Sequence, residues 1–510
     1  MRALISVYDK AGLDVFARGL ADLGWELVAS GGTAAYLEEL GLEIEKVEDL
    51  TKSPEMLGGR VKTLHPRIHA AILARRDRDD DVATLQLHEI EPFDLVCVNL
   101  YPFEQVSARR GVTEAEAVEM IDVGGPSMLR GAAKNFAHCA PVCRPARYAF
   151  VLEQLREHGE LSLETRRELA AEAFATTAAY DAAIASWFAE TEPFPETVVV
   201  ALDKVLDLAY GENPHQRAAY YAERGSRSHL LSRVEQVHGK PLSFNNLNDL
   251  AAARLLAREF ALPACVIVKH ANPCGAAVGE TAEEAYDKAL ASDPTSAYGG
   301  VVVLNREVEA ELGEKLAEQF VEVLFAPAYT DGALEALMRK QGTRILVDHE
   351  RRRGGYESRS LKRVPGGLLI QDPDAEIEDR EGWQVVCGAP DERQWGDLVF
   401  AWRVCKHVSS NAIVLVKDLA TIGIGAGQMS RVDAVRIAVE KAGAYGHDLA
   451  GSALASDAFF PFPDGPRIAL DAGTSSIVQP GGSRRDQDVI DAVEKAGAAM
   501  VFTGRRHFRH

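Results

Sequence analysis

The stretch ACVIVKHANPCG, residues 264–275, contains the most informative pattern in this chain. Its β-branched run at 266–268 is typical of a strand buried on both faces of a sheet. Lys269 and His270 follow at the end of that strand, and we predict a turn at Asn272–Pro273 because proline disfavours helix in the residue before it. A cation and an imidazole therefore stand where open α/β sheets bind their ligands.

This pair is suited to acid–base chemistry. Histidine exchanges a proton readily near neutral pH, and a nearby positive charge favours its neutral form, so we predict that His270 acts as a general base. Consecutive strand residues point to opposite faces, so Lys269 and His270 can serve one site only if the strand has ended by Lys269. We predict that it has; an ordinary polar strand end is the alternative.

The composition limits the class of protein. At 510 residues the chain exceeds one ordinary core, so we expect two or three domains. Its 47% hydrophobic and 26% charged residues are typical of a soluble globular protein, and we find neither a signal peptide nor a membrane-spanning run. The net charge of −20 argues against a general nucleic-acid surface. Seven scattered cysteines predict reduced thiols and a cytoplasmic location.

Two loops in the first half are suited to bind a phosphate. Residues 3–7 and 25–29 are predicted strands, followed by predicted helices at 12–24 and 34–40. The second strand runs into a turn of Ser30, Gly31, Gly32 and Thr33, and backbone N–H groups at a helix start attract phosphate. The loop GGRVKTLHP, residues 58–66, adds cations, a hydroxyl and an imidazole. An ordinary αβ turn and a solvated loop are the alternatives.

Two later loops carry further polar side chains. A predicted strand ends at Asn99 and is followed by Tyr101, and a Gly-rich turn at 121–127 carries Asp122 before a helix that includes Lys134. A doubly wound α/β domain brings such loops to one edge of its sheet. Structural roles remain the alternative for these side chains, with Asp122 as a helix cap.

The motifs SGGTA, GGRVKTLHP, NLYPF and IDVGGPSMLRGAAKN, in this order, resemble the cyclohydrolase half of the AICAR transformylase/IMP cyclohydrolase family. The resemblance implies a methylglyoxal-synthase-like α/β domain with a parallel sheet. It implies that the groups nearest the ring closure are Lys62, Tyr101, Asp122 and Lys134. It also implies that the nucleotide is held by Lys10, Ser30, Gly31, Gly32, Thr33, Arg60, Lys62, Thr63 and Asn99. Tyr8 is a departure, because a bulky phenol replaces the family's serine.

The second half follows a linker. The segment TEPFP at 191–195 breaks helical structure, so we place one domain at 1–192 and the other at 193–510. An apolar run at 412–416, followed by Lys417, repeats the pattern of strand and lysine at 266–269 and hints at two related subdomains.

Two familiar signatures are incomplete in this half. The alternating glycines of GIGAGQ, residues 423–428, lack the dinucleotide-binding spacing and instead indicate close approach of another backbone or a flat ring. His270 and Cys274 resemble part of the zinc nucleobase deaminase signature, but Asn272 and Ala277 replace required residues. We therefore predict no metal.

YGENPHQ, FNNLND, VKHANPCG, SNAIVLV, IGIGAGQMSR, SDAFFPF and the terminal RRHF resemble the transformylase half of the same family. The resemblance implies two cytidine-deaminase-like α/β subdomains without zinc, with catalytic roles for Lys269, His270 and Asn411. It implies that the folate is held by Arg431, Phe459, Asp464, Ser483 and Arg506, and that Tyr210 and Gly299 contact the substrate. Ala209 stands where the family has an arginine, and Arg217 is a candidate replacement.

The sequence thus predicts an enzyme of purine biosynthesis with two steps. AICAR takes a formyl group from 10-formyltetrahydrofolate, and formyl-AICAR then closes to IMP with loss of water. The resemblance implies a homodimer, and no metal or nicotinamide is needed. Two alternatives remain open: a nucleotide-sensing first half, or a chain with only one of the two activities.

Overall fold

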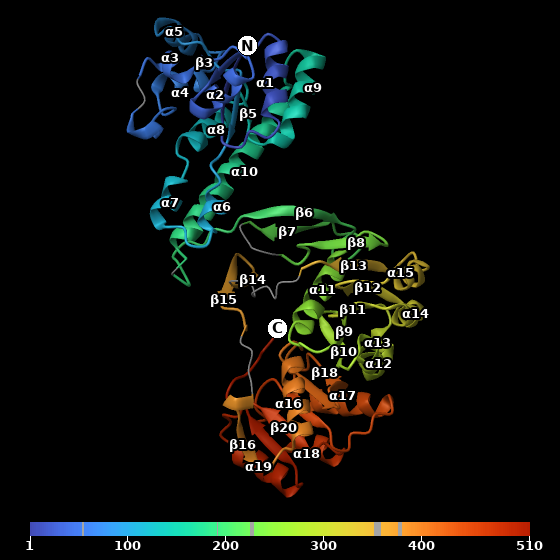
Figure 1. Cartoon of the computed structure of the whole chain (residues 1–510). Helices are drawn as coiled ribbons and strands as arrows, with labels where there is room; N and C mark the ends of the chain where they lie inside the picture. Colours follow the sequence, from blue (N-terminus) through green and yellow to red (C-terminus); the bar gives the residue numbers. More distant parts are fainter. Residues whose placement is uncertain (54–55, 191, 225–228, 351–358, 376–379) are drawn as a thin grey trace. The chain divides into compact units, whose positions relative to one another are not determined.

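The computed structural model describes residues 1–53, 56–190, 192–224, 229–350, 359–375 and 380–510 (Figure 1). The chain divides into two compact units. The first comprises Met1–Asp203 with Ala222–Arg227, and the second comprises Lys204–Tyr221 with Ser228–His510, of which residues 225–228 lie outside the described part.

The first unit is built on a five-stranded parallel sheet in the order β3-β2-β1-β4-β5. Its strands are β1 (Arg2–Val7), β2 (Glu26–Ala29), β3 (Glu45–Lys46), β4 (Leu95–Asn99) and β5 (Ala140–Val142). The order reverses between β1 and β4, which is the position where doubly wound sheets form their ligand crevice. The expected parallel α/β domain is therefore confirmed.

Helices cover both faces of this sheet because successive strand residues point to opposite sides. Ala3 and Ile5 pack with α1 (Leu13–Asp22) and α9 (Tyr148–His158). Leu4 packs on the other face, with helices α4 (Pro66–Leu73), α8 (Gly124–Lys134) and α10 (Leu163–Phe188). The other helices are α2 (Gly31–Glu39), α3 (Val47–Thr51), α5 (Asp79–Leu87), α6 (Phe103–Ser107) and α7 (Glu114–Glu119). Helix α2 begins earlier than predicted, inside the Gly-Gly turn.

The second unit contains a twelve-stranded sheet made of two subdomains with matching topology. The first subdomain contributes β8 (Val234–His238), β9 (Ala264–Lys269), β10 (Asn272–Val278), β11 (Gly300–Leu304), β12 (Val321–Ala326) and β13 (Arg344–Asp348). The second contributes β16 (Gln384–Cys387), β17 (Ile413–Lys417), β18 (Ala420–Gly425), β19 (Ala453–Ser456), β20 (Ser476–Gln479) and β21 (Ala499–Phe502). The order is β16-β21-β20-β19-β17-β18-β10-β9-β11-β12-β13-β8, so β10 and β18 join the halves.

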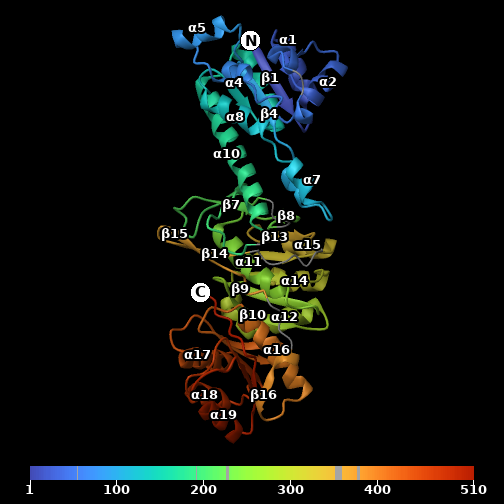
Figure 2. The same cartoon turned by 90° about the vertical axis from the view of Figure 1, so that its left-hand side faces the viewer.

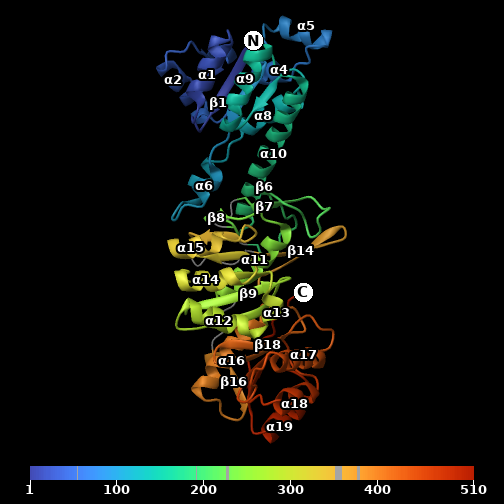
Figure 3. The ribbon, with the colours of Figure 1, turned by 90° about the vertical axis from the view of Figure 1, so that its right-hand side faces the viewer.

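The two subdomains repeat one arrangement. Each has an antiparallel hairpin, three parallel strands and an antiparallel outer strand. Helices α11 (Phe244–Ala257) and α16 (Glu392–Cys405) share a core on one face. The other face is covered by α12 (Ala282–Ser292), α14 (Ala310–Glu318) and α15 (Asp331–Met338) in the first subdomain, and by α17 (Arg431–Ala444), α18 (Asp464–Asp471) and α19 (Asp486–Lys495) in the second. Figures 2 and 3 show these two helix sets beside their own strands. The repeat predicted from the two strand–lysine patterns is confirmed.

The hairpin turn that follows Lys269 lies earlier than predicted. His270 and Ala271 form it, with left-handed φ values of +53° and +59°, and Asn272–Pro273 already belong to β10. Proline excludes helix from the residue before it but is compatible with extended backbone, so the Asn-Pro signal did not fix the turn. Two shorter sheets complete the unit's strands: β6 (Leu202–Leu208) with β7 (Ala218–Glu223), and β14 (Ser360–Val364) with β15 (Gly367–Gln371).

Candidate active sites

In the first unit, the predicted phosphate turn is fixed to the end of β1. The hydroxyl of Thr33 donates to the carbonyl of Val7 (3.0 Å) and accepts the N–H of the same residue (3.1 Å). The Ser30 hydroxyl lies 3.2 Å from that of Ser6. Gly31 has a φ of +49°, which a glycine adopts without strain. The turn therefore holds the first backbone N–H groups of α2 at the carboxyl edge of the sheet, as an anion site requires.

Asn99 connects the neighbouring strand ends. Its side-chain oxygen accepts the N–H of Tyr8 (2.6 Å), and its amide donates to the carbonyl of Asp9 (2.7 Å). The half-exposed ring of Tyr8 meets that of Tyr101 edge-on, with centroids 5.6 Å apart. Lys10 donates to the carbonyls at the end of β1. The phenol that replaces the family's serine thus lies next to a predicted catalytic residue.

The GGRVKTLHP loop sends only part of its polar side chains to this turn. Lys62 forms an ion pair with Glu48, and its Nζ lies 3.4 Å from the position that a Cβ on Gly31 would occupy. Thr63 is buried and packs near the start of α8. Arg60 instead pairs with Glu119, and its side chain is 67% exposed. Lys62 therefore lies beside the turn at 30–33, Thr63 lies at the start of α8, and Arg60 is engaged at the surface.

Tyr101 and Asp122 influence each other's environment. Burial and the nearby Asp122 carboxylate raise the pKa of the Tyr101 phenol, which therefore stays protonated at neutral pH. Burial also raises the pKa of Asp122, although its Oδ1 accepts the N–H of Gly125 (2.8 Å) as a helix cap does. Lys134 lies apart from these groups: it ends α8, about 15 Å along the helix axis from Gly124.

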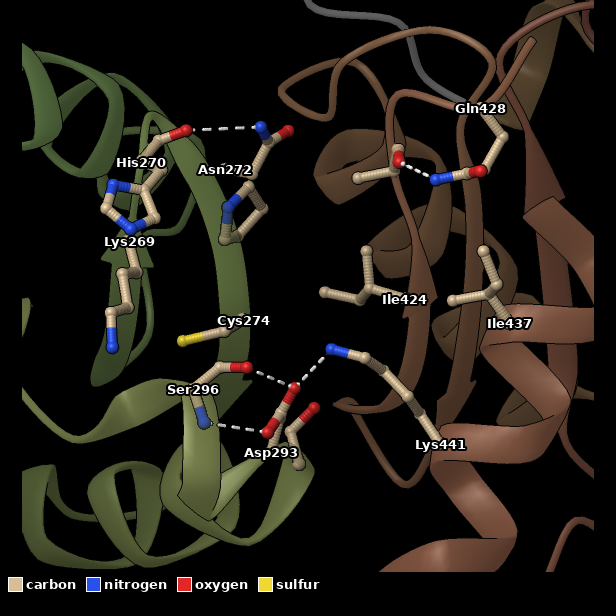
Figure 4. Close-up of a pocket in the computed structure, with 13 residues that line it drawn as sticks. Lys269, His270, Asn272, Cys274, Asp293, Ser296, Ile424, Gln428, Ile437 and Lys441 are labelled. Carbon is tan, nitrogen blue, oxygen red and sulfur yellow. Dashed lines mark hydrogen bonds and ion pairs between the residues drawn. The ribbon is translucent and has the colours of Figure 1, made fainter.

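In the second unit, Lys269 and His270 line one pocket of about 280 Å³ (Figure 4). β9 ends at Lys269 and the left-handed turn follows, so the prediction that the strand has ended here is confirmed. The ammonium of Lys269 donates to the carbonyl of Tyr298 (2.8 Å), which directly precedes the predicted Gly299. The His270 ring is exposed at the pocket and free to meet a ligand.

The opposite wall of the pocket comes from the second subdomain and was not predicted. α17 supplies Lys441, which forms an ion pair with Asp293. The Asp293 carboxylate also accepts the N–H (2.9 Å) and the hydroxyl (2.7 Å) of Ser296. Although burial opposes it, the ion pair with Lys441 lowers the pKa of Asp293. The Asp-Pro pair at 293–294 signals a helix cap in the sequence, but nothing there indicates the distant lysine.

Asn272 connects the turn of His270 and Ala271 to the segment that contains Asn411. Its side-chain oxygen accepts the N–H of Ser409 (2.8 Å), and its amide donates to the carbonyl of His270 (3.3 Å). Asn411 in turn donates to the carbonyl of Gln428 (2.8 Å), a residue that lines the pocket. Asn411 itself is not part of the pocket lining.

Arg431, predicted to bind folate, is engaged within the protein. Its guanidinium pairs with the fully buried Asp457, donates to Ser456 (2.8 Å) and donates to the side-chain oxygen of Asn411 (2.7 Å). Ser410 also donates to Asp457. These contacts fix the orientation of the Asn411 amide, so in this structure Arg431 supports Asn411.

The other folate candidates follow strand ends of the second subdomain. Register places the starts of β17 and β11 and the ends of β9, β18, β19, β20 and β21 at one edge of the sheet. This edge carries Gly299, His270, Asn411, Arg431, Phe459, Asp464, Ser483 and Arg506. β9 and β20 are five strand spacings apart, about 24 Å, so Ser483, which follows β20, is far from His270 within one chain. The C-terminal tail that carries Arg506 instead returns along this edge: His507 donates its N–H to the carbonyl of Asp457 (3.0 Å), and Arg509 donates its N–H to the hydroxyl of Ser410 (3.1 Å).

Two further positions near the start of the second unit are hydrogen-bonded to the segment that begins α11. Tyr210 accepts the N–H of Phe244 through its carbonyl (3.1 Å), and Ala209 donates to the carbonyl of Leu242 (2.8 Å). Arg217 is exposed and makes no hydrogen bond or ion pair with another described residue. The structure therefore gives no contact that assigns Arg217 the role of the missing arginine.

Among the described residues, no group of three or more His, Cys, Asp or Glu is arranged to hold a metal ion. No helix in the described part of the chain is long and apolar enough to cross a bilayer.

Comparison with known proteins decides the family. The AICARFT/IMPCHase bienzyme model matches residues 132–441, and the MGS-like domain model matches residues 12–127. The chain belongs to the AICARFT/IMPCHase bienzyme family. The bifunctional purine biosynthesis protein PurH of Anoxybacillus flavithermus is 51% identical over 514 residues, covering 100% of this chain and 99% of that protein. PurH of Bacillus cereus is 48% identical over 513 residues, with the same coverage. A crystal structure of ForH shares 40% identity over 37% of this chain and 98% of its own, with a TM-score of 0.34.

These comparisons confirm the family and the enzyme class that the motifs predicted. The match to an MGS-like domain agrees with the parallel sheet of the first unit. As a family member the chain is an AICAR formyltransferase and IMP cyclohydrolase. The roles of the individual residues stay predictions.

Proposed function

We propose that the second unit transfers a formyl group from 10-formyltetrahydrofolate to the 5-amino group of AICAR, and that the first unit closes formyl-AICAR to IMP. The observation that carries the proposal is the placement of Lys269 and His270 at one pocket. His270 leaves the strand through a left-handed turn, so its imidazole and the Lys269 ammonium can act on one reacting group.

Formyl transfer needs a base. The AICAR amine is conjugated with the imidazole ring and is a poor nucleophile, so His270 removes its proton as nitrogen attacks the formyl carbon. The tetrahedral intermediate carries an oxyanion that the Lys269 ammonium can stabilise, because Tyr298 engages only one of its donors. Collapse breaks the bond from carbon to N10 of the folate. The proton on His270 then goes to N10, giving tetrahydrofolate and formyl-AICAR.

Ring closure requires mainly correct orientation. The carboxamide nitrogen of formyl-AICAR attacks its own formyl carbon, and water leaves. Holding the two groups in attack geometry can remove much of the barrier. We assign the phosphate to the turn at 30–33 and Lys62, and proton transfer to Tyr101 and Asp122. The phenol of Tyr101 carries a proton at neutral pH and can therefore donate it.

The first experiment compares His270→Ala with Asp418→Ala. Asp418 holds the same place in the hairpin turn of the second subdomain and is exposed, so it is a matched control. We expect His270→Ala to lower kcat for formyl transfer by about 100-fold or more, the usual contribution of a general base, and Asp418→Ala to leave it unchanged. Near-normal transfer by His270→Ala would refute the assignment.

We also infer a homodimer with 10-formyltetrahydrofolate bound where two copies meet. Ser483, which follows β20, lies about 24 Å from His270 in one chain, so a second copy can complete the site. Mixing His270→Ala chains with Ser483→Ala chains, each impaired in formyl transfer on its own, should then restore part of that activity. Absence of any recovery, with mixed dimers demonstrated by mass spectrometry, would contradict a shared site. The seven cysteines, all unpaired, support a reducing cytoplasmic location.

A nucleotide-sensing first unit is the second candidate, favoured by the exposed Tyr8 ring beside Tyr101. The test supplies formyl-AICAR directly to wild type and to Lys62→Ala. Loss of IMP formation in the variant supports catalysis by the first unit, whereas full IMP formation in the variant favours a sensor.

A further inference from the structure

The turn that carries His270 is held by one carboxylate of α11. Asp249 accepts the N–H of His270 through one oxygen (3.2 Å) and the N–H of Ala271 through the other (2.7 Å). Both turn residues are left-handed, a conformation that their Cβ atoms disfavour. Backbone in this region persists only where its surroundings impose it, and Asp249 supplies the hydrogen bonds that do so.

The second subdomain contains the same carboxylate-held turn, but without a histidine. Asp397 of α16 accepts the N–H groups of Asp418 (3.2 Å) and Leu419 (2.8 Å), which have φ values of +53° and +57°. Each of these residues stands the same number of positions after its counterpart in the first subdomain. That turn has no histidine, so the carboxylate is not explained by proton transfer to an imidazole. Its shared task in both hairpins is to hold a left-handed turn.

We propose that Asp249 is a positioning residue for formyl transfer: it fixes the left-handed turn from which the His270 imidazole faces the pocket. This inference rests on the proposed role of His270 as the base. The side chain of His270 has no hydrogen-bond partner among the described residues, so its placement depends on the backbone. An extended residue at 270 would continue β9, and its side chain would point to the face opposite that of Lys269.

Both oxygens of Asp249 are required. Asparagine offers one acceptor oxygen and turns its NH₂ group toward the second N–H, so one hydrogen bond is lost and two donors face each other. Burial raises the pKa of Asp249, and the two backbone N–H groups oppose that rise. We therefore expect the isosteric change to loosen the turn without altering side-chain volume.

The test combines Asp249→Asn, the double variant Asp249→Asn/Ala271→Gly and the control Asp397→Asn. Steady-state formyl transfer is measured with AICAR and 10-formyltetrahydrofolate, and folding is followed by thermal unfolding. Asp249→Asn should lower kcat about 10- to 100-fold while the KM for AICAR changes less than about threefold. Ala271→Gly should restore at least about a third of the lost activity, because glycine adopts a positive φ without a Cβ clash. Asp397→Asn should lower the melting temperature comparably yet keep kcat within about twofold.

If Asp249→Asn does lose activity, either of two further results would overturn the positioning role. One is an equal loss of kcat in Asp397→Asn, which would mean that general destabilisation explains both variants. The other is an inactive Asp249→Asn protein that glycine at 271 does not rescue, which would indicate a direct chemical role for the carboxylate. Failure of the proposed function is separate, since it appears as full activity in His270→Ala. Failure of the positioning role alone appears as normal transfer by Asp249→Asn together with inactive His270→Ala.

Discussion

At the scale of single residues, burial and hydrogen bonding determine the pKa of side chains that the sequence identifies only as polar candidates. The motif predicted Asp122 as a polar group, but not that burial raises its pKa. An ionised buried carboxylate destabilises the folded state, and this penalty is present once the pH has risen through the folded-state pKa. Protonation at lower pH removes it.

We therefore expect Asp122→Asn to raise the melting temperature of the first unit at pH 7 and to abolish most IMP formation from formyl-AICAR. The stabilisation should shrink as the pH falls through the folded-state pKa, because the wild-type carboxyl then becomes neutral too. Thermal unfolding between pH 4 and pH 8 measures this directly. Asparagine can keep the contact with Gly125 through its oxygen, so a variant less stable than wild type at pH 7 would show that the carboxylate charge stabilises the fold and would contradict this prediction.

Local sequence patterns predicted the positions of some site residues but not their partners. The apolar run before Lys269 and the Gly-Gly turn at 31–32 gave reliable positions. The ion pairs of two residues could not be predicted. Arg431 pairs with Asp457 and Lys441 pairs with Asp293, and each partner lies on a different element far along the chain. Ion pairs formed by folding leave no spacing signal in one sequence.

At the scale of elements, close packing explains the alternating glycines of β18. A Cβ on Gly425 would lie 1.9 Å from the carbonyl oxygen of Ala434, and one on Gly423 would lie 2.2 Å from that of Ala438. The approach of another backbone, which the sequence pattern indicated, is thus provided by α17. The sequence could not say which backbone it would be, because the packing of α17 against β18 is set by the tertiary fold.

We expect Gly425→Ala to destabilise the second unit by about 2 kcal/mol or more, because neither backbone can move freely. Gly443→Ala is the control within α17: nothing lies within 4 Å of its added Cβ, so alanine should be neutral or stabilising by about 0.5–1 kcal/mol. Chemical denaturation of both variants measures the difference. Equal stability of the two proteins would contradict the packing account.

The turn predicted at Asn272–Pro273 was wrong because its position depends on contacts between elements. Proline indicates only that the preceding residue is not helical. The position of the turn is set instead by the carboxylate of Asp249, which lies on another element. A positive φ in His270 and Ala271 is not visible in their identities, because neither is glycine.

At the scale of the whole molecule, each unit has hydrophobic cores of its own. The limits 1–192 and 193–510 remain our proposal for the domains, while contacts extend the first unit to Asp203. The Ser186 hydroxyl, for example, donates to the carbonyl of Val199 (3.5 Å). Sequence composition located the linker region, but it could not show how far the chain beyond it packs back.

We expect a fragment of residues 1–203 to close formyl-AICAR to IMP at a rate within about tenfold of the intact protein, because the loops at its sheet edge all come from that fragment. Fragment 1–192 should be less stable because it lacks the contact at Val199. Parallel melting curves and cyclisation assays check both points. A 1–203 fragment that folds but cannot cyclise would show that the first unit needs the second for catalysis.

The central claim is that one chain performs formyl transfer and ring closure in sequence. The most direct measurement mixes the protein with AICAR and 10-formyltetrahydrofolate and follows tetrahydrofolate and IMP in the same reaction. We predict that both products form in equal final amounts, without lasting accumulation of formyl-AICAR. Tetrahydrofolate without IMP, or neither product, would contradict the account.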